Sequence, residues 1–380
     1  ETNTKIDLAI KKAPTEEKRR DETCVENAYK NEIFFYKTLM PTLKRFQQEC
    51  GIFDIFDPVP TYVASVSEVD AEMIVFEDLT SHGYQMREKD LVLDKEHVRF
   101  IFETYGRFHA LSFCLKDQKP DEFRILTKSC HNIFKEFTRK KGFSLSLSKI
   151  AERCLKAFDQ NRDGQVIEKF KIYADKTMDI FADSLKYKGE YSGILHGDCW
   201  SNNMMFKYQN SQNKSKLEAI KLLDFQMIFV GSPVYDLSYF FYSGGSKELF
   251  DNLEHYLDVY YRSFSNFAQN LGSVPKKLLP REVLTEDWKK YSKFGMLMSI
   301  LLTKVKLMTK EASIELAESI NEEKNNESGL VNATVNEELF NERSPNLTFN
   351  VERGDEFLSE FYKVDEEINT KIDLALKKAP

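Results

Sequence analysis

The chain has 380 residues, of which 42% are hydrophobic and 13% aromatic, and its formal net charge is −7. This composition is typical of a packed globular protein and excludes a chain that is disordered throughout. The negative charge argues against nucleic acid as the main partner, because binding a phosphate backbone requires a broad basic surface. A small-molecule partner is therefore expected.

The sequence also predicts where the protein resides. Its six cysteines are scattered, without a Cys-x-x-Cys pair or a metal-type spacing, and this pattern indicates reduced thiols. The first residues, ETNTKIDLAIKKAP, lack the regions of a signal peptide, and the most apolar stretch, FGMLMSILL, is too short to span a bilayer. We expect a cytoplasmic protein that does not contact a membrane.

In chain order, the first predicted elements form a small, partly β-rich region. Residues 5–12 have the pattern of a strand, and residues 23–40 carry apolar positions at helical spacing up to Pro41, where this helix is expected to stop. MIVF at 73–76 is expected to be a buried strand. The segment EDLTSHG that begins at Glu77 then breaks the pattern and marks a connection.

The next region is mainly helical and contains one predicted hairpin. Helical periodicity dominates residues 95–188, and more helices follow the hairpin up to about residue 320. The hairpin is predicted from NNMMFKY, a polar turn QNSQNKSK, and LEAIKLLDF. Residues 321–345 are interpreted as a polar linker, and residues 346–380 alternate like two or three strands.

One segment imitates a calcium-binding EF-hand loop. In residues 159–170 the acidic and amide positions and Gly164 are in register, but the twelfth position, which should be a bidentate Glu, is Phe170. We interpret the segment as a polar turn between helices.

The two ends of the chain carry nearly the same sequence. Residues 1–14, ETNTKIDLAIKKAP, return as residues 367–380, EINTKIDLALKKAP. A match separated by a whole domain predicts a piece of a tandem array, in which neighbouring copies of the same domain are partners.

The strongest functional signal is LHGDCWSNN at 195–203, followed by LLDFQ at 222–226. The spacing from Asp198 to Asn203 and on to Asp224 is that of a kinase catalytic loop and metal-binding loop. Phosphoryl transfer needs a group that orients the attacking hydroxyl and oxygen ligands that hold Mg²⁺ on the phosphates. Asp198 is placed for the first task, and Asn203 with Asp224 for the second.

Two features of this motif refine the prediction. Antiparallel pairing of the hairpin is expected to bring Asn203 and Asp224 to the same end. His196 is expected to brace the loop by hydrogen bonding and not to act as a base, since nothing pairs it with a nucleophile. His109 is expected to be a packing residue of a helix.

These motifs resemble a known family. HGDCWSNNMMFKY with LLDFQ, and upstream VFEDLTSHGY and YGRFHALSF, are similar to the ecdysteroid kinase-like family of insects and other invertebrates, in the choline kinase and aminoglycoside phosphotransferase branch. The resemblance implies an α+β, protein-kinase-like two-lobed fold, with an N-lobe at 1–76, a hinge at 77–82 and a helical C-lobe at 83–320. It also implies ATP and Mg²⁺ as cofactors and phosphotransferase activity toward an alcohol group of a small organic substrate, such as an ecdysteroid or another steroid-like molecule.

The resemblance assigns residues of the first lobe. The segment IKKAP resembles the strand that carries the phosphate-binding lysine, which makes Lys11 that residue. Lys12 points to the opposite face of a strand and cannot share the site. Glu32 resembles the helix glutamate that pairs with this lysine, with a solvated surface glutamate as the alternative.

Further residues are assigned in the same way. VFEDL resembles the hinge, where main-chain groups of Glu77, Asp78 and Leu79 would meet adenine. Asp236 resembles an aspartate that tethers the catalytic loop, although it would also suit a helix N-cap. Trp200 is interpreted as an aromatic anchor under the loop, with a role in the acceptor pocket as the alternative.

The sequence departs from the family at its beginning. A kinase needs two strands and a Gly-containing loop before the lysine strand, and residues 1–4 cannot supply them. The segment around Gly354 resembles this missing element at the wrong end of the chain. Residues 346–380 either open the N-lobe of a following domain or fold back to complete this one, in which case Lys377 would compete with Lys11.

Three functions are therefore weighed. The triplet DFQ lacks the glycine of protein kinases, and no long activation segment follows it, which favours a small acceptor over a peptide. A small-molecule kinase is the leading hypothesis. The alternatives are an inactive pseudokinase or binding module of the array, and a choline or amino-sugar kinase with a carboxylate-lined acceptor cleft.

Overall fold

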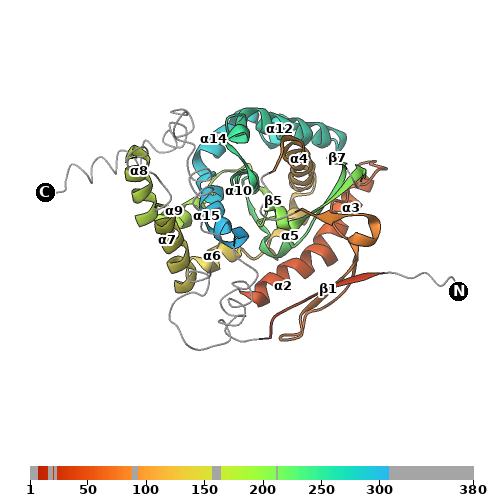
Figure 1. Cartoon of the computed structure of the whole chain (residues 1–380). Coiled ribbons are helices and arrows are strands. Elements are labelled where there is room, and N and C mark those ends of the chain that lie inside the picture. Colours follow the sequence, from red (N-terminus) through yellow and green to blue (C-terminus); the bar gives the residue numbers. More distant parts are fainter. Residues whose placement is uncertain are drawn as a thin grey trace.

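The computed structural model describes residues 7–15, 20, 24–87, 93–155, 164–210 and 213–307. They form mixed α/β structure in which helices predominate over three small sheets. Strand β1 and helix α2 lie together at one side of the molecule, and helices α7, α8 and α9 lie at the opposite side (Figure 1). Helix α10 runs through the middle, where it packs against α15 (Figure 1).

The first sheet is antiparallel, with the order β1-β3-β2. Its strands are β1 (Leu8–Lys12), β2 (Tyr62–Val66) and β3 (Met73–Glu77). Helix α2 (Val25–Phe34) covers one face of this sheet.

The face covered by α2 is the one that carries Lys11. In the register of β1 and β3, Lys11 is paired with Ile74, so the two side chains point to the same face. Ile74 is fully buried and packs against Val25, Tyr29 and Ile33 of α2. The packing of the sheet therefore turns Lys11 toward the interior.

The first helix does not stop at Pro41, as the sequence was expected to dictate. A π-helical turn, Phe35–Leu39, follows α2 and leads into α3 (Met40–Glu49). The N–H of Met40 bonds to the carbonyl of Phe35, five residues earlier. Pro41 thus lies in the first turn of α3, where its missing N–H breaks no helical bond, and the prediction is wrong for this reason.

The predicted hairpin is present in the second sheet, whose order is β4-β6-β7. Its strands are β4 (Gln85–Met86), β6 (Met204–Asn210) and β7 (Asn213–Leu222). Strand β7 begins within the segment predicted as a turn, so the connection is shorter than expected. A third, two-stranded sheet of β5 (Gly193–Leu195) and β8 (Phe229–Gly231) flanks the hairpin in the sequence.

Helices were predicted for residues 95–188 and for the region after the hairpin, and the described residues of both regions are mainly helical. The helices are α4 (Lys95–Gln118), α5 (Pro120–Thr127), α6 (Ile133–Phe137), α7 (Lys141–Leu155), α8 (Gly164–Asp175), α9 (Thr177–Ser184), α10 (Val234–Gly244), α11 (Lys247–Phe250), α12 (Leu253–Asn270), α13 (Pro275–Leu278), α14 (Arg281–Tyr291) and α15 (Lys293–Leu307). Three 3₁₀ turns complete the list: η2 (Leu79–His82), η3 (Ser201–Asn203) and η4 (Phe225–Met227).

One large core joins these helices to the hairpin, and many of the aromatic side chains belong to it. Tyr105, Tyr235, Tyr239 and Tyr260 are buried, as are several Phe side chains. Burial of so much apolar surface is the main stabilising term of such a fold.

Several predictions can be compared with this fold. None of the six cysteines forms a disulfide, as expected.

The EF-hand-like segment differs from its prediction. Residues 164–170 belong to α8 and Phe170 is buried, so this half of the segment is helix and not the predicted turn. Among the described residues, no helix is long and apolar enough to cross a membrane.

The C-terminal predictions lie outside the described residues. These are the linker at 321–345, Gly354 with the phosphate-loop-like segment, and the fold-back of residues 346–380.

Candidate active site

One cleft of about 310 Å³ is lined by many of the residues singled out by the sequence, and Asp198 is hydrogen-bonded to one of them, Asn203; these lining residues are Lys11, Glu32, Glu77, Asp78, Leu79, Asn203 and Asp224. The lining comes from strand β1, helix α2, the connection after β3, and the first and last residues of the hairpin, which lie side by side at its open end. Apolar walls are formed by Ala9, Phe76, Met205 and Leu223. The polar groups gather at the hairpin end of the cleft.

The register of the hairpin brings the predicted metal ligands together. Met204 pairs with Leu222, and the N–H of Leu223 donates to the carbonyl of Asn203 at 2.8 Å. Asn203 therefore lies beside the residue that precedes Asp224, as antiparallel pairing requires. Asp224 itself has φ 65° and ψ 62°, a left-handed conformation that costs free energy in a residue with a Cβ.

Lys11 connects three elements across the cleft. Its Nζ lies 2.5 Å from Glu32 Oε2 and 2.6 Å from Asp224 Oδ1. Burial opposes the charged ammonium, but the two carboxylates outweigh it and raise the pKa of Lys11. The side chain of Glu32 is 1% exposed, and this burial raises its own pKa. Lys12, on the other face of β1, is exposed.

Asp198 is held from two sides. Its Oδ1 accepts a hydrogen bond from Tyr239 Oη at 2.9 Å, and its Oδ2 accepts one from Asn203 Nδ2 at 2.7 Å. Burial and the neighbouring charge of Asp224 raise the pKa of Asp198 to about 6. The carboxylate is thus fixed in orientation and is more basic than an exposed aspartate.

His196 links the catalytic loop to the strand that precedes Asp224. Its Nε2 donates to the carbonyl of Leu223 at 2.9 Å, and its Nδ1 accepts the N–H of Asp198 at 3.2 Å. Burial lowers the pKa of His196, so the ring is neutral and has a hydrogen-bond partner on each nitrogen. These contacts are those of a brace.

Asp236 tethers the same loop. Its carboxylate accepts the N–H groups of His196 at 2.7 Å and Gly197 at 2.9 Å. The N-cap of α10 is Pro233, and Asp236 lies in the first turn of the helix, so the alternative of a helix N-cap is wrong.

Sequence reasoning missed two residues around this loop, namely His109, which contacts Asp236, and Tyr239, which contacts Asp198. His109 was expected to pack only, but its Nε2 lies 3.1 Å from Asp236 Oδ2 and its Nδ1 lies 3.1 Å from the hydroxyl of Tyr260. Burial opposes the charge of Asp236, yet the hydrogen bond from His109 lowers its pKa. Tyr239 was also missed, although its spacing of three from Asp236 places both on one face of α10.

The hinge assignment is narrowed by main-chain hydrogen bonds. The N–H of Glu77 donates to Thr61 at 3.0 Å, and that of Asp78 donates to Asp7 at 2.8 Å. The side chain of Asp78 accepts the N–H of Thr80 and caps turn η2. The N–H groups of Glu77 and Asp78 are therefore already used within the protein. Of the three assigned to the hinge, the N–H of Leu79 is left to donate to a ligand.

The donor set of the cleft fits magnesium. Within the described residues, no cluster of three or more His, Cys, Asp or Glu side chains is placed to hold a metal. The cleft instead offers the carboxylate of Asp224, already in contact with an ammonium, and the amide oxygen of Asn203, whose nitrogen is bonded to Asp198. An oxygen pair of this kind suits Mg²⁺ that is also bound by phosphates and water.

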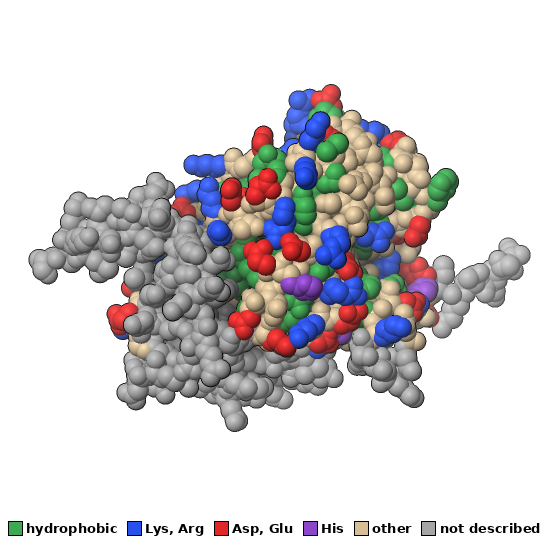
Figure 2. Space-filling view, turned by 90° about the horizontal axis from the view of Figure 1, so that it is seen from above, with side chains coloured by type: hydrophobic (Ala, Val, Ile, Leu, Met, Phe, Trp, Pro, Cys, Tyr) green, Lys and Arg blue, Asp and Glu red, His purple; other side chains and the backbone are tan. Residues whose placement is uncertain are grey.

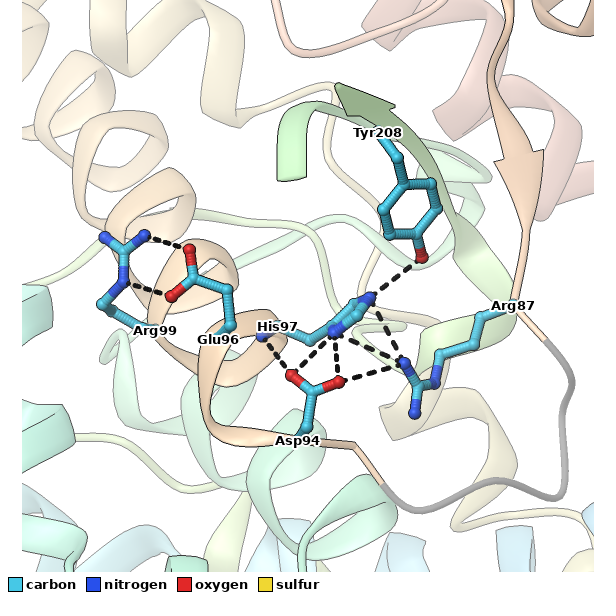
Figure 3. Close-up of polar contacts among 6 residues, drawn as sticks. All are labelled: Arg87, Asp94, Glu96, His97, Arg99 and Tyr208. Atoms are coloured by element: carbon cyan, nitrogen blue, oxygen red, sulfur yellow. Dashed lines mark hydrogen bonds and ion pairs between the residues drawn. The ribbon is translucent and has the colours of Figure 1, made fainter. Parts of the chain in front are cut away.

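The outer part of the hairpin is anchored to the start of α4. His97 is 1% exposed, and its Nε2 lies 2.9 Å from the hydroxyl of Tyr208 on β6. Figure 3 shows the His97 ring between Tyr208 and Asp94, with Arg87 beside it; Asp94 Oδ2 lies 2.8 Å from His97 Nδ1. Trp200 precedes the first strand of the hairpin. Its side chain is partly buried against the core, as expected for an aromatic anchor under the loop.

Comparison with known proteins agrees with this geometry. A search of curated proteins returned no match. The model of the ecdysteroid kinase-like family matches residues 1–273, a range that includes β1, the catalytic loop, the hairpin and the tether. This match covers more than half of the sequence, and the chain belongs to the ecdysteroid kinase-like family.

Proposed function

We propose that the chain is an ATP- and Mg²⁺-dependent kinase that transfers the γ-phosphoryl group to a hydroxyl of a small organic molecule. The observation that carries the proposal is the convergence of Asp198, Asn203, Asp224 and Lys11 at one end of an apolar cleft. These groups match the needs of phosphoryl transfer, which are positioning and compensation of charge.

The cleft orients the nucleotide in this proposal. The first sheet with α2 and α3 corresponds to an N-lobe, and the helical remainder with the hairpin corresponds to a C-lobe. Adenine lies between apolar walls such as Phe76 and Met205, next to the N–H of Leu79. The ammonium of Lys11 then faces the phosphates, with Glu32 fixing its direction.

Asp198 carries the chemistry toward the acceptor. Its carboxylate accepts a hydrogen bond from the substrate hydroxyl and takes its proton while the new O–P bond forms and the bond to the ADP oxygen breaks. Tyr239 and Asn203 hold the carboxylate in position for this contact. Asn203 and Asp224 would hold Mg²⁺, and a bound ion would compensate the charge of the phosphates.

The connection after Asp224 favours a small acceptor. The chain passes through η4 and β8 and enters α10 at Val234, ten residues after Asp224. A peptide substrate needs a longer segment to lie on. The family supports an alcohol of the ecdysteroid or steroid-like type as the acceptor.

The test is a phosphorylation assay with Asp198→Asn. The panel contains an ecdysteroid, a sterol, choline and an amino sugar, with ATP and Mg²⁺. We expect the variant to lose about 10²- to 10⁴-fold in turnover, because a positioned acid-base group contributes this much. Binding of ATP, measured by calorimetry, should remain.

The matched control is Asp121→Asn, which changes an exposed carboxylate on α5. It should act like the wild type. Equal turnover in Asp198→Asn and wild type would remove Asp198 from the mechanism. ATP binding without phosphorylation of any alcohol would favour a binding module, and phosphorylation of choline or the amino sugar alone would favour that kinase class.

A further inference from the structure

A second cavity, of about 520 Å³, lies apart from the cleft. Its walls come from the loop after α3 at residues 54–58 and from α4, β7 and α12. These elements lie together on the side of the molecule where the labels α3, α4, α12 and β7 gather (Figure 1). Seven of the 18 lining residues are charged, four of them acidic and three basic, and the arrangement of these charges is specific.

Most acidic side chains around this cavity already have a cation. Three ion pairs account for them: Asp57 with Lys44 at 2.6 Å, Glu103 with Arg99 at 2.5 Å, and Glu218 with Lys207 at 3.0 Å. Each of these cations approaches from outside the cavity lining. Asp57 and Glu218 therefore add little net charge to the interior, whereas Arg99 also pairs with Glu96 at 2.6 Å and compensates Glu103 only in part.

Unlike most of the acidic side chains, the two arginines of the cavity form no ion pair with another described residue. Within the described part of the chain, no hydrogen bond or ion pair holds Arg107 or Arg262, although Asp54 acts on Arg107 through its charge. The guanidinium of Arg107 lies over the rings of Phe56 at 4.1 Å and Phe267 at 4.9 Å. This stacking fixes the plane of the guanidinium and leaves its N–H groups for an acceptor.

The third basic residue of the lining, Lys221, holds the loop at residues 54–58 in place. Lys221 of β7 donates to the carbonyls of Asp57 at 2.7 Å and Val59 at 2.8 Å. The N–H of Leu222 also donates to the carbonyl of Pro58 at 2.7 Å. These bonds fasten the loop to β7, so the cavity is formed before any ligand arrives.

We propose that this cavity binds a small organic anion, with its acidic group on Arg107 and an apolar body against Phe56 and neighbouring rings. A planar, stacked guanidinium suits the two oxygens of a carboxylate, sulfonate or phosphate. The face seen in Figure 2 carries acidic and basic side chains side by side, so no field of one sign favours anions there. The selectivity arises inside the cavity, from the positive charges of Arg107 and Arg262, which no ion pair among the described residues neutralises and which together exceed the one charge of Asp54. This site goes beyond the proposed kinase activity and does not depend on it.

The test uses 1-anilinonaphthalene-8-sulfonate, an aromatic sulfonate whose fluorescence reports binding. Its uncharged counterpart, N-phenyl-1-naphthylamine, is titrated beside it. In Arg107→Gln we expect the affinity for the sulfonate to fall about tenfold or more, because a charge-assisted pair is lost. The affinity for the uncharged probe should not change.

Two further variants complete the design. Asn266→Trp places a large ring on an exposed position of α12 that lines the cavity, and it should exclude both probes. Arg124→Gln removes an exposed arginine of α5 that does not line the cavity, and it should bind like the wild type. Circular dichroism checks folding, and Asn266→Trp decides alone if Arg107→Gln does not fold.

The proposal fails if the sulfonate binds Arg107→Gln and Asn266→Trp as tightly as the wild type. It also fails if the wild type does not bind the sulfonate more tightly than the uncharged probe.

Discussion

Strand β7 lines the Arg107 cavity and leads into Leu223 and Asp224 of the candidate active-site cleft, yet the charges of the two regions are arranged in opposite ways. In the cleft, the carboxylates of Glu32, Asp198 and Asp224 meet the single ammonium of Lys11. In the cavity, most acids are paired with outside cations, and among the described residues no carboxylate forms an ion pair with Arg107, although the charge of Asp54 acts on it. An excess of carboxylates suits a magnesium-bound nucleotide, and a free guanidinium suits an anion.

The two regions also differ in how tightly they enclose residues with a left-handed backbone. Asp224 and Gly197, in the loops of the cleft, have this conformation. Gly51, three residues before the loop that lines the cavity, has it as well. A Cβ at Gly197 would meet the backbone of Met227, whereas nothing lies within 4 Å of a Cβ at Gly51, and this difference can be measured.

The largest effect is expected for Gly197→Ala. At φ 84°, the new Cβ would lie 2.1 Å from the carbonyl oxygen of Met227. Adding the strain of φ to the steric clash, we expect the free energy of unfolding to fall by about 4 kcal/mol. Urea denaturation measures the change.

Gly51→Ala is the matched control. Its φ of 79° is similar, but nothing lies within 4 Å of the added Cβ. The variant should lose about 1 kcal/mol, the cost of the backbone conformation alone. Equal losses in the two variants would show that the cleft is not packed more tightly around its strained loop than the region near the cavity.

The next effect concerns the charge balance of the cleft. Lys11→Met removes the ammonium between Glu32 and Asp224, and we expect ATP affinity to fall about 10- to 100-fold because a charged hydrogen-bonding partner of the phosphates is lost. Lys12→Met changes the neighbouring lysine on the exposed face of β1 and should bind ATP normally. Calorimetric titration compares the two, and a similar loss in Lys12→Met would contradict the assignment of Lys11.

The sequence could predict the parts of the site that depend on local chain geometry. Asn203 and Asp224 flank one hairpin, so strand pairing alone brings them together. The bracing role of His196 follows from its place in the loop, and the resemblance to the family supplied Asp236, Lys11 and Glu32.

The parts that it could not predict depend on packing between distant helices. Tyr239 reaches Asp198 because α10 packs beside the loop, and His109 reaches Asp236 from α4. The Arg107 cavity needs α4, α12 and β7 in their final positions. No periodicity within one segment carries this information. The turn before Pro41 was missed for a local reason, because a π-helical turn has no clear sequence signal.

The smallest expected effect is the loss of stability that the ionised carboxylate of Asp198 causes in the cleft. Without metal and nucleotide, burial and Asp224 raise the pKa of Asp198 from its usual 3.8 to about 6. An acid with a raised pKa destabilises the fold where it is ionised, so the penalty is present above about pH 6 and absent below pH 3.8. Asp198→Asn removes this charge, and its unfolding temperature should exceed that of the wild type at pH 8. The difference should shrink as the pH falls toward 4, whereas Asp121→Asn, on an exposed carboxylate, should show no such trend. A variant that is no more stable than the wild type at pH 8 would mean that the contacts of Asp198 with Tyr239 and Asn203 fully offset its burial, and that the cleft holds its carboxylates without strain.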